Sequence, residues 1–324
     1  MVKILSVFWH GIAPDPLPPE FDSKDPGPST FKAQVEFLAQ RYHPITVWDF
    51  LDLIDGARSI SSYSKPPILL GFDDGFKSVI ANALPILTQL GVPAVFFVVA
   101  GVIENPHFIP WFVQRCYVIR RTGRKRIMYQ GISLDLASPQ DRERAHRLSE
   151  RAFRGATCEQ EREAVLTGFA EALGVPRPGV EDLDCDLRFI ADEDLRQLNQ
   201  SSILAVASHA TTHRHLGDLG LVEQQDELRR SDAILRRYGS YCPVIAYPAG
   251  SFDSTTTSLA QEIYRAGFAV SSGASFGNPY AYPRVGLGRQ TQRDLAYTLS
   301  PMRLRILVPL KKWLRGSPFP RHPA

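Results

Sequence analysis

The chain carries the stretch Ile68-Leu-Leu-Gly-Phe-Asp-Asp-Gly75, in which an apolar run leads directly into two adjacent carboxylates and a glycine. A short, continuous apolar run is typical of a buried strand in a parallel sheet. The Asp-Asp-Gly end taken alone indicates no more than a turn. Two acidic side chains at a strand end can also divide their work, one binding a cation while the other acts as a base.

Similar apolar runs lie on both sides of this stretch and alternate with helix-like segments. The predicted strands are Ile4–Trp9, Ile68–Phe72, Ala94–Val99, Ile203–Ser208, Val244–Tyr247 and Ala269–Ser272. The predicted helices are Phe31–Arg41, Val79–Leu90, Asp192–Asn199, Leu221–Tyr238 and Leu259–Ala266. This alternation predicts an α/β fold with a parallel sheet wrapped by helices, and in such folds the chemistry gathers at the carboxyl ends of the strands.

A second strand end carries two histidines, in Ser208-His-Ala-Thr-Thr-His213. If this segment forms a helical turn, the spacing of His209 and His213 places both imidazoles on one side, where they can bind one metal ion. His215 follows two residues later and is expected to point elsewhere. An aspartate joined to two histidines is typical of a catalytic divalent-metal site, most often zinc, with water in the remaining positions.

Composition excludes several classes of protein. The 324 residues include 37 basic and 34 acidic side chains, a net charge of +3 that is too balanced for a nucleic-acid surface. The sequence contains no run of eighteen apolar residues, so a membrane-spanning helix is not expected. The cysteines are far apart and form no CxxC pair, which predicts reduced thiols. Because the N-terminal segment also lacks a secretory layout, a cytoplasmic location is expected.

Two segments depart from the alternation of strands and helices. We expect one domain over residues 1–300, interrupted by a largely helical insertion at about 106–186. The insertion is rich in Arg and Glu, which indicates a solvated helical face or, alternatively, a lid over the substrate. The basic, apolar tail at 301–324 either contacts an anionic membrane surface at its periphery or packs as a last helix with a frayed, proline-rich end.

Three ordered motifs resemble those of the polysaccharide deacetylases with a NodB-homology domain, carbohydrate esterase family 4. They are Phe72-Asp-Asp-Gly75, Ser208-His-x-x-x-His213 and Ala246-Tyr-Pro-x-Gly250. The strand that ends at His10 and the segment Gly91-Val-Pro-Ala-Val-Phe-Phe97 also resemble this family. The resemblance implies a distorted (β/α) barrel that removes an acyl group from an N-acylated sugar.

The resemblance also implies a role for each motif residue. Asp74, His209 and His213 would bind the divalent metal, zinc first, with cobalt or another divalent ion as alternatives. Asp73 would be the general base that takes a proton from metal-bound water, the nucleophile. The turn at Tyr247, Pro248 and Gly250 would supply a backbone N–H that, together with the metal, holds the oxyanion.

The sequence departs from the family pattern at two places. Many members carry an Arg where this chain has Ala246, and Arg284 is similar to the substitute found in other branches; it could equally be an ordinary surface or phosphate-facing arginine. Many members also end with a Leu-x-x-His motif that supplies a general acid, but no histidine occurs between His215 and His322. His10 is the replacement candidate, with a structural histidine as the alternative.

These observations predict a metal-dependent enzyme that removes an N-acetyl group from an amino sugar or glycan intermediate in biosynthesis. Because no export signal is seen, the substrate is expected at the inner membrane face and in a lipid-linked form, which would suit the basic tail. A deformylase or another hydrolase of non-peptide amides, such as a ureide-cleaving enzyme, would use the same groups. A degenerate glycan-binding domain is the third reading, and the retention of Asp73 argues against it.

Overall fold

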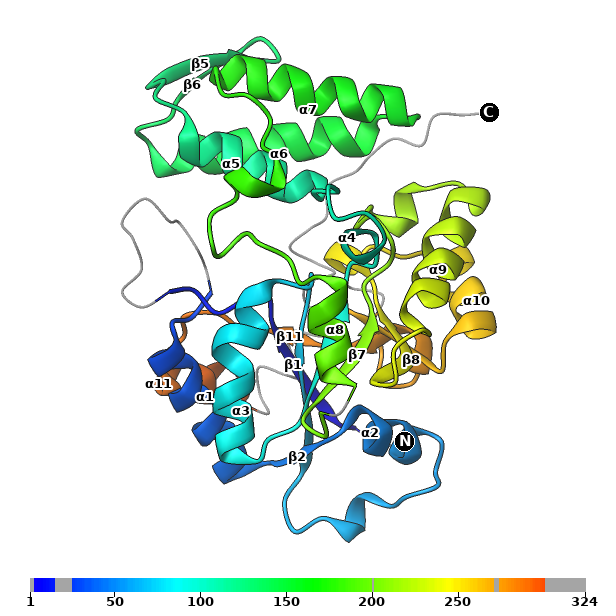
Figure 1. Ribbon diagram of the computed structural model, residues 1–324. Helices are drawn as coiled ribbons and strands as arrows, with labels where there is room; N and C mark the ends of the chain where they lie inside the picture. The colour runs from blue at the N-terminus through cyan, green and yellow to red at the C-terminus, as the bar shows by residue number, and fades with distance from the viewer. Residues whose placement is uncertain (1–2, 15–24, 200, 271–273, 301–324) are drawn as a thin grey trace.

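The computed structural model describes residues 3–14, 25–199, 201–270 and 274–300 (Figure 1). The predicted tail at 301–324 therefore lies outside the described residues, and its membrane contact stays a prediction. Among the helices described, none has the length and apolar character needed to cross a membrane.

The core of the fold is a parallel sheet that curves into a nearly closed barrel. Its strands follow the order β10-β9-β8-β7-β4-β3-β1-β11, and β2 lies beside the first half of β3. The strands are β1 (Leu5–Trp9), β2 (His43–Ile45), β3 (Pro67–Phe72), β4 (Ala94–Val98), β7 (Leu204–Ser208), β8 (Tyr241–Ala246), β9 (Ala266–Ala269), β10 (Tyr282–Pro283) and β11 (Val285–Gly286). The predicted α/β class and distorted barrel are confirmed.

The two edges of the sheet meet at a single segment of chain. β10 pairs with β9, and β11 pairs with β1, and only Arg284 separates β10 from β11. Backbone hydrogen bonds continue across the junction, from Arg284 N–H to Ala269 O at 3.0 Å and from Leu287 N–H to Phe8 O at 2.7 Å. Arg284 therefore stands at the seam that closes the barrel.

Helices cover the outside of the barrel (Figure 1). The helices are α1 (Pro28–Arg41), α2 (Val47–Ile54), α3 (Leu84–Leu90), α4 (Gly101–Glu104), α8 (Asp192–Leu198), α9 (Leu221–Leu235), α10 (Ser254–Ile263) and α11 (Gln292–Thr298). Short turns are η1 (Ile60–Ser62), the π-helical η2 (Val79–Ala83), η3 (Val180–Asp182), η4 (Leu216–Asp218), η5 (Pro248–Gly250) and η6 (Pro279–Ala281).

Alternation along the strands divides the apolar core into two parts. Leu70 and Phe72 of β3 belong to a cluster shared with α1 and α3, outside the barrel. Leu69, directly before Leu70, belongs to a second cluster, in which Phe268 of β9 contacts Phe50 of α2 with ring centroids 5.0 Å apart. Because successive side chains of a strand point to opposite faces, a strand buried on both faces must be apolar throughout, as this one is.

Most of the segment between β4 and β7, from α5 to α7, folds as a separate layer that lies above the carboxyl ends of the strands (Figure 1). It contains α5 (Trp111–Arg121), β5 (Arg126–Tyr129), β6 (Ile132–Asp135), α6 (Pro139–Gly155) and α7 (Glu159–Leu173). The hairpin turns at Gln130 and Gly131, both with positive φ, which is the geometry that a two-residue turn requires. A small apolar core that includes Leu134 and Phe169 holds the layer together.

Two of the predicted elements are shifted near the C-terminus. The predicted helix at 259–266 begins earlier and ends earlier, as α10, because Asp253 caps it by accepting a hydrogen bond from Thr256 N–H at 2.8 Å. Of the strand predicted at 269–272, only Ala269 belongs to a strand, β9 at Ala266–Ala269, and positions 271 and 272 lie outside the described residues. The apolar run in this part of the sequence does not indicate where the strand begins or ends. Its pairing with β8 decides which residues form β9.

Candidate active site

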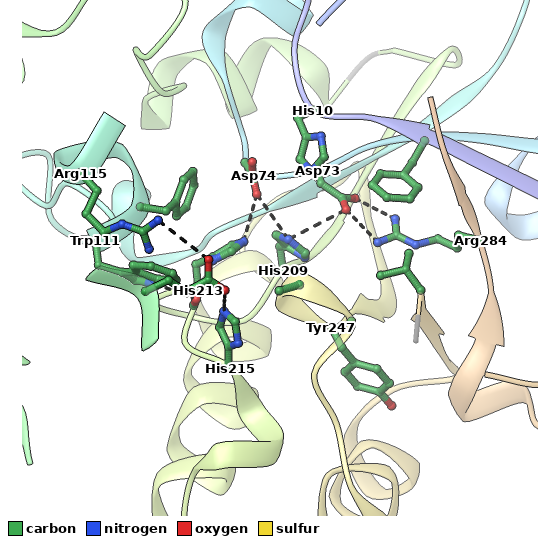
Figure 2. Close-up of a pocket in the computed structure, with 16 residues that line it drawn as sticks. His10, Asp73, Asp74, Trp111, Arg115, His209, His213, His215, Tyr247 and Arg284 are labelled. Carbon is green, nitrogen blue, oxygen red and sulfur yellow. Dashed lines mark hydrogen bonds and ion pairs between the residues drawn. The ribbon is translucent and has the colours of Figure 1, made fainter. Parts of the chain in front are cut away.

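A cavity of about 400 Å³ lies at the carboxyl end of the barrel (Figure 2). The predicted site residues that line it are His10, Asp73, Asp74, His209, His213, Tyr247, Gly250 and Arg284. Arg284 lies between β10 and β11, and the others follow β1, β3, β7 and β8. The closure of the barrel therefore brings them together. Pro248 is buried in the η5 turn and does not line the cavity.

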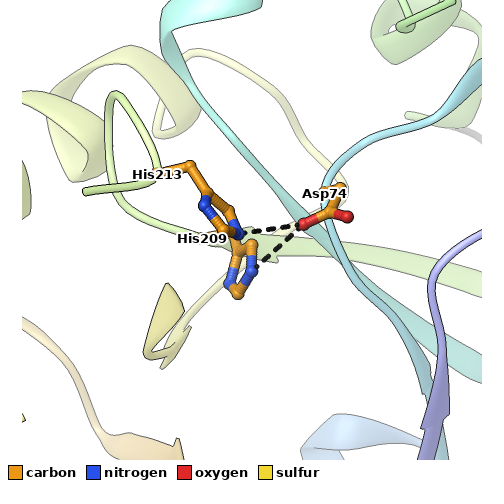
Figure 3. A group of neighbouring side chains, drawn as sticks. All are labelled: Asp74, His209 and His213. Carbon is orange, nitrogen blue, oxygen red and sulfur yellow. Dashed lines mark ion pairs between the residues drawn. The ribbon is translucent and has the colours of Figure 1, made fainter. Parts of the chain in front are cut away.

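Three of these side chains form a tight group (Figure 3). Asp74 Oδ1 lies 3.4 Å from His209 Nε2 and 3.2 Å from His213 Nε2. One ligand atom from each residue lies within 4.8 Å of the others, and all three side chains are buried. A carboxylate and two imidazoles at such distances form the donor set of a divalent-metal site with open positions.

The hydrogen-bonding state of Asp74 and His209 suits the binding of a cation between them. Asp74 Oδ1 is buried and has no hydrogen-bond partner among the described residues, and such a group is costly to leave unpaired. His209 Nδ1 lies 2.7 Å from the carbonyl oxygen of Ala246. Since a carbonyl can only accept, Nδ1 carries the proton and the lone pair of Nε2 points at Asp74.

The protonation state of His213 also suits a metal. Burial lowers the pKa of His213. His213 therefore presents a neutral imidazole, the form in which histidine binds metals.

The segment from His209 to His213 is a loop, so the helical turn expected from the spacing is wrong. Ala210 and His213 both have a φ of 61°, which no α-helix accommodates. The carboxylate of Glu227, on α9, instead holds the loop by accepting from Thr211 N–H at 2.9 Å and Thr212 N–H at 2.8 Å. The two imidazoles converge because of this tertiary contact.

Backbone strain is concentrated at the same place. Apart from glycines, the described residues with positive φ are Asp74, Gln130, Ala210, His213 and Ala249. All but Gln130 belong to the strand ends at the cavity. Such conformations cost about 1–3 kcal/mol each and persist at functional sites, where the surrounding structure enforces them.

Asp73 makes a different set of contacts from its neighbour. Arg284 donates from Nη1 to Asp73 Oδ1 and from Nη2 to Oδ2, both at 2.7 Å. Both side chains are buried, and the guanidinium lies 4.2 Å from the ring centroid of Phe8. The reading of Arg284 as an ordinary surface or phosphate-facing arginine is therefore wrong. Asp73 Oδ2 also lies 4.0 Å from His209 Nε2, beside the metal group.

The third motif forms the η5 turn, and its hydrogen bonds narrow the choice of oxyanion donor. Tyr247 N–H already donates to Phe268 O at 3.0 Å, and Gly250 N–H donates to Tyr247 O at 2.8 Å. Neither amide is free for a ligand, which corrects the expectation for these two residues. Ala249 lines the cavity, and no hydrogen bond links its N–H to another of the described residues.

His10 lies at the rim of the cavity, directly after β1. Its side chain is exposed, and its ring packs edge-on against Phe8 with centroids 5.5 Å apart. His215 lines another part of the cavity, 3.8 Å from Glu150 Oε1. Of these two histidines, His10 is the one near Asp73 (Figure 2).

Several residues of the cavity were missed by sequence reasoning. The layer between β4 and β7 supplies Trp111, Phe112, Arg115 and Glu150 to its wall. Trp111 Nε1 donates to the carbonyl oxygen of His213 at 3.0 Å and so ties this layer to a candidate metal ligand. The only sequence signal was the position of the segment after a strand end, which suggested a lid but indicated no residue.

Comparison with known proteins bears on the same region. The family model described as "Polysaccharide deacetylase" matches residues 61–267, which include the Asp-Asp pair, both histidines and Tyr247. No curated protein matches the chain.

Solved structures similar to this one include three bacterial proteins. Deacetylase PplD of Streptococcus pyogenes, solved with acetate, is 17% identical, with a TM-score of 0.56 over 93% of this chain and 99% of that one. IcaB of Ammonifex degensii is 16% identical, with a TM-score of 0.55 over 92% and 97%. The polysaccharide deacetylase BC0361 of Bacillus cereus is 16% identical, with a TM-score of 0.57 over 92% and 69%. At these identities the likeness shows a shared fold.

Proposed function

Because the chain belongs to the polysaccharide deacetylase family, and is thus a hydrolase of carbon–nitrogen bonds other than peptide bonds, we propose that it removes an N-acetyl group from an amino sugar or glycan intermediate with the help of a divalent metal. One observation carries the proposal. The buried Oδ1 of Asp74, without a hydrogen-bond partner among the described residues, faces Nε2 of both His209 and His213, while Asp73 is held apart by Arg284.

Asp74, His209 and His213 would hold the metal, and zinc suits a set of one carboxylate and two imidazoles best. When bound, such an ion supplies Lewis-acid chemistry, polarising the acyl carbonyl and acidifying a water molecule. Cobalt or another divalent ion could take the same ligands.

Asp73 acts as the general base. Its two oxygens accept from Arg284, but each carboxylate oxygen has a second lone pair, so Oδ2 can still accept a proton from the attacking water. The bidentate contact fixes the plane of the carboxylate, and it keeps Asp73 from turning toward the metal group. Arg284 thereby acts as a positioning residue for the base.

Charge that develops on the acyl oxygen needs a donor, and the departing amine needs a proton. The Ala249 N–H lies in the cavity-lining turn next to Tyr247 and can donate to that oxygen along with the metal. His10 stands on the opposite rim near Asp73 and can deliver the proton to the amine. Figure 2 shows Asp73 between His10 and Tyr247.

The substrate class is a glycan or an N-acylated sugar, which the family supports. We further propose that it is a biosynthetic intermediate in the cytoplasm, lipid-linked at the inner membrane face, with the basic tail at 301–324 as a peripheral contact. The sequence of the tail supports this placement.

The experiment is elemental analysis of protein purified without chelator, followed by assay of acetate release from N-acetyl sugars and oligosaccharides. Wild-type protein should hold about one divalent ion per chain and release acetate, and His209→Ala should lose both the ion and the activity. His107→Ala is the matched control, because this histidine is exposed and outside the cavity. Asp73→Asn should keep the ion and lose the activity. Wild-type protein that takes up neither zinc nor cobalt would contradict the proposal.

A further inference from the structure

A buried charge on α5 faces the cavity from the side opposite Arg284 (Figure 2). Arg115 is only 5% exposed, yet it lines the cavity. Its Nε and Nη1 are buried and have no hydrogen-bond partner among the described residues. Burying a guanidinium with donors unused is costly, and the cost persists unless a ligand supplies the missing acceptors.

The neighbours of Arg115 only partly balance its charge. Nη2 lies 3.8 Å from Glu150 Oε2, too far for a hydrogen bond, and the side chain of Glu150 is 38% exposed to solvent. The guanidinium lies 4.7 Å from the ring centroid of Trp111, a contact that orients it without satisfying its N–H groups. Burial lowers the pKa of Arg115 although Glu150 acts in the opposite direction.

The position of this arginine relative to the candidate metal ligands is fixed. Trp111, one turn before Arg115 on α5, donates to the carbonyl oxygen of His213 at 3.0 Å. Its indole also stacks on Phe153 of α6, with ring centroids 4.5 Å apart and planes 13° apart. Asp74 and Arg115 line the same cavity, so a substrate whose acyl group lies at Asp74 can reach Arg115 with another part of the molecule.

We propose that Arg115 binds an anionic group, a carboxylate or a phosphate, that the N-acylated sugar carries. This inference rests on the proposed function and narrows its substrate class to acidic or phosphorylated sugars. A planar guanidinium with two free donor atoms matches the paired oxygens of a carboxylate or phosphate. Sugar hydroxyls would leave the buried charge without compensation. On the far side, the charge of Arg284 is already balanced by Asp73, whereas Arg115 has no carboxylate within hydrogen-bond distance among the described residues.

The test is calorimetric binding to protein stripped of metal, so that an anion cannot bind to the ion. The probes are N-acetylglucosamine, N-acetylglucosamine 1-phosphate, N-acetylglucosaminuronic acid and inorganic phosphate. Wild-type protein should bind at least one charged probe about tenfold or more tightly than the neutral sugar. Comparison of the uronic acid with the two phosphate probes tells which anion is preferred.

Arg115→Gln should abolish that difference, and Arg115→Lys should restore part of it, because lysine keeps the charge but loses the planar fork. Arg121→Gln is the matched control on the same helix, since Arg121 is half-exposed and pairs with Asp184. Wild-type protein that binds no charged probe more tightly than the neutral sugar overturns the proposal, and so does an Arg115→Gln variant that keeps the difference. Failure of the metal-loaded protein to release acetate would instead overturn the proposed function.

Discussion

Arg284 donates a hydrogen bond of 2.7 Å to each carboxylate oxygen of Asp73, although the two residues are 211 positions apart in the chain. The contact forms because Arg284 occupies the one-residue seam between β10 and β11, and only β1 separates β11 from β3, the strand that directly precedes Asp73. The ring centroids of Phe8 and Phe97 lie 4.2 Å and 5.1 Å from the Arg284 guanidinium carbon, and these rings shield the ion pair from solvent. Asp73, the proposed base, is thus held by the same residue that joins the edges of the barrel.

Replacement of that arginine should affect turnover more than metal binding. Arg284→Lys keeps a positive charge but cannot hold both oxygens, so Asp73 can rotate away from the attacking water, and kcat should fall by about 100-fold. Metal content should not change. Steady-state kinetics with elemental analysis checks this, with Arg265→Lys, at an exposed arginine, as the control. A loss of metal in Arg284→Lys would show that the arginine supports the ligands instead.

His10→Asn should slow deacetylation by about 10²- to 10⁴-fold, because the departing amine loses its proton donor. Hydrolysis of 4-nitrophenyl acetate should be much less affected, since nitrophenolate leaves without a proton. The two rates measured side by side on wild type and variant provide the check. Equal losses on both substrates would assign His10 a structural role.

Glu227→Gln should weaken metal binding by about 10- to 100-fold. The Glu227 carboxylate is 1% exposed and accepts from two backbone N–H groups of the loop that carries His209 and His213. An amide presents one acceptor oxygen in place of two and weakens the contacts to Thr212 and Arg214.

The matched control for this change is Glu223→Gln. Glu223 also contacts Arg214, at 2.8 Å, but its side chain is 38% exposed and no contact with the loop backbone is found among the described residues. Titration of metal-free protein with zinc against a competing chelator measures both variants. Equal affinities in the two variants would refute the role of Glu227.

His215 should make the protein less stable in mild acid. Burial, aided by the nearby charge of Arg154, lowers the pKa of His215 to about 3. The unfolded chain protonates this group near pH 6.5, so between pH 6.5 and 3 the unfolded state binds more protons and stability falls as the pH falls. The contribution is at most about 1.4 kcal/mol per pH unit.

Urea unfolding of metal-stripped protein at pH 7.5 and pH 5 measures this effect. His215→Asn should lose less stability than wild type between the two pH values, and His107→Asn, at an exposed histidine, should behave as wild type does. If the variant and wild type lost the same free energy of unfolding, His215 would not be the group responsible.

Much of the fold was predictable because its signals are local. Apolar runs such as Ile68–Phe72 mark strands that are buried on both faces, and polar residues directly after them mark the carboxyl edge. The elements that were misplaced or missed are short. β10 and β11 have two residues each and are strands only because β9 and β1 lie beside them.

The sequence alone determined which residues stand at the strand ends and that an aspartate and two histidines are among them. The tertiary structure alone decided the conformation of these segments and the partners of their side chains. It bent the His209–His213 segment into a loop held by Glu227, paired Arg284 with Asp73, and placed Arg115 over the cavity. Periodicity and motif spacing report on neighbours along the chain, whereas burial of a charge and the choice of its partner depend on segments that meet only when the barrel closes.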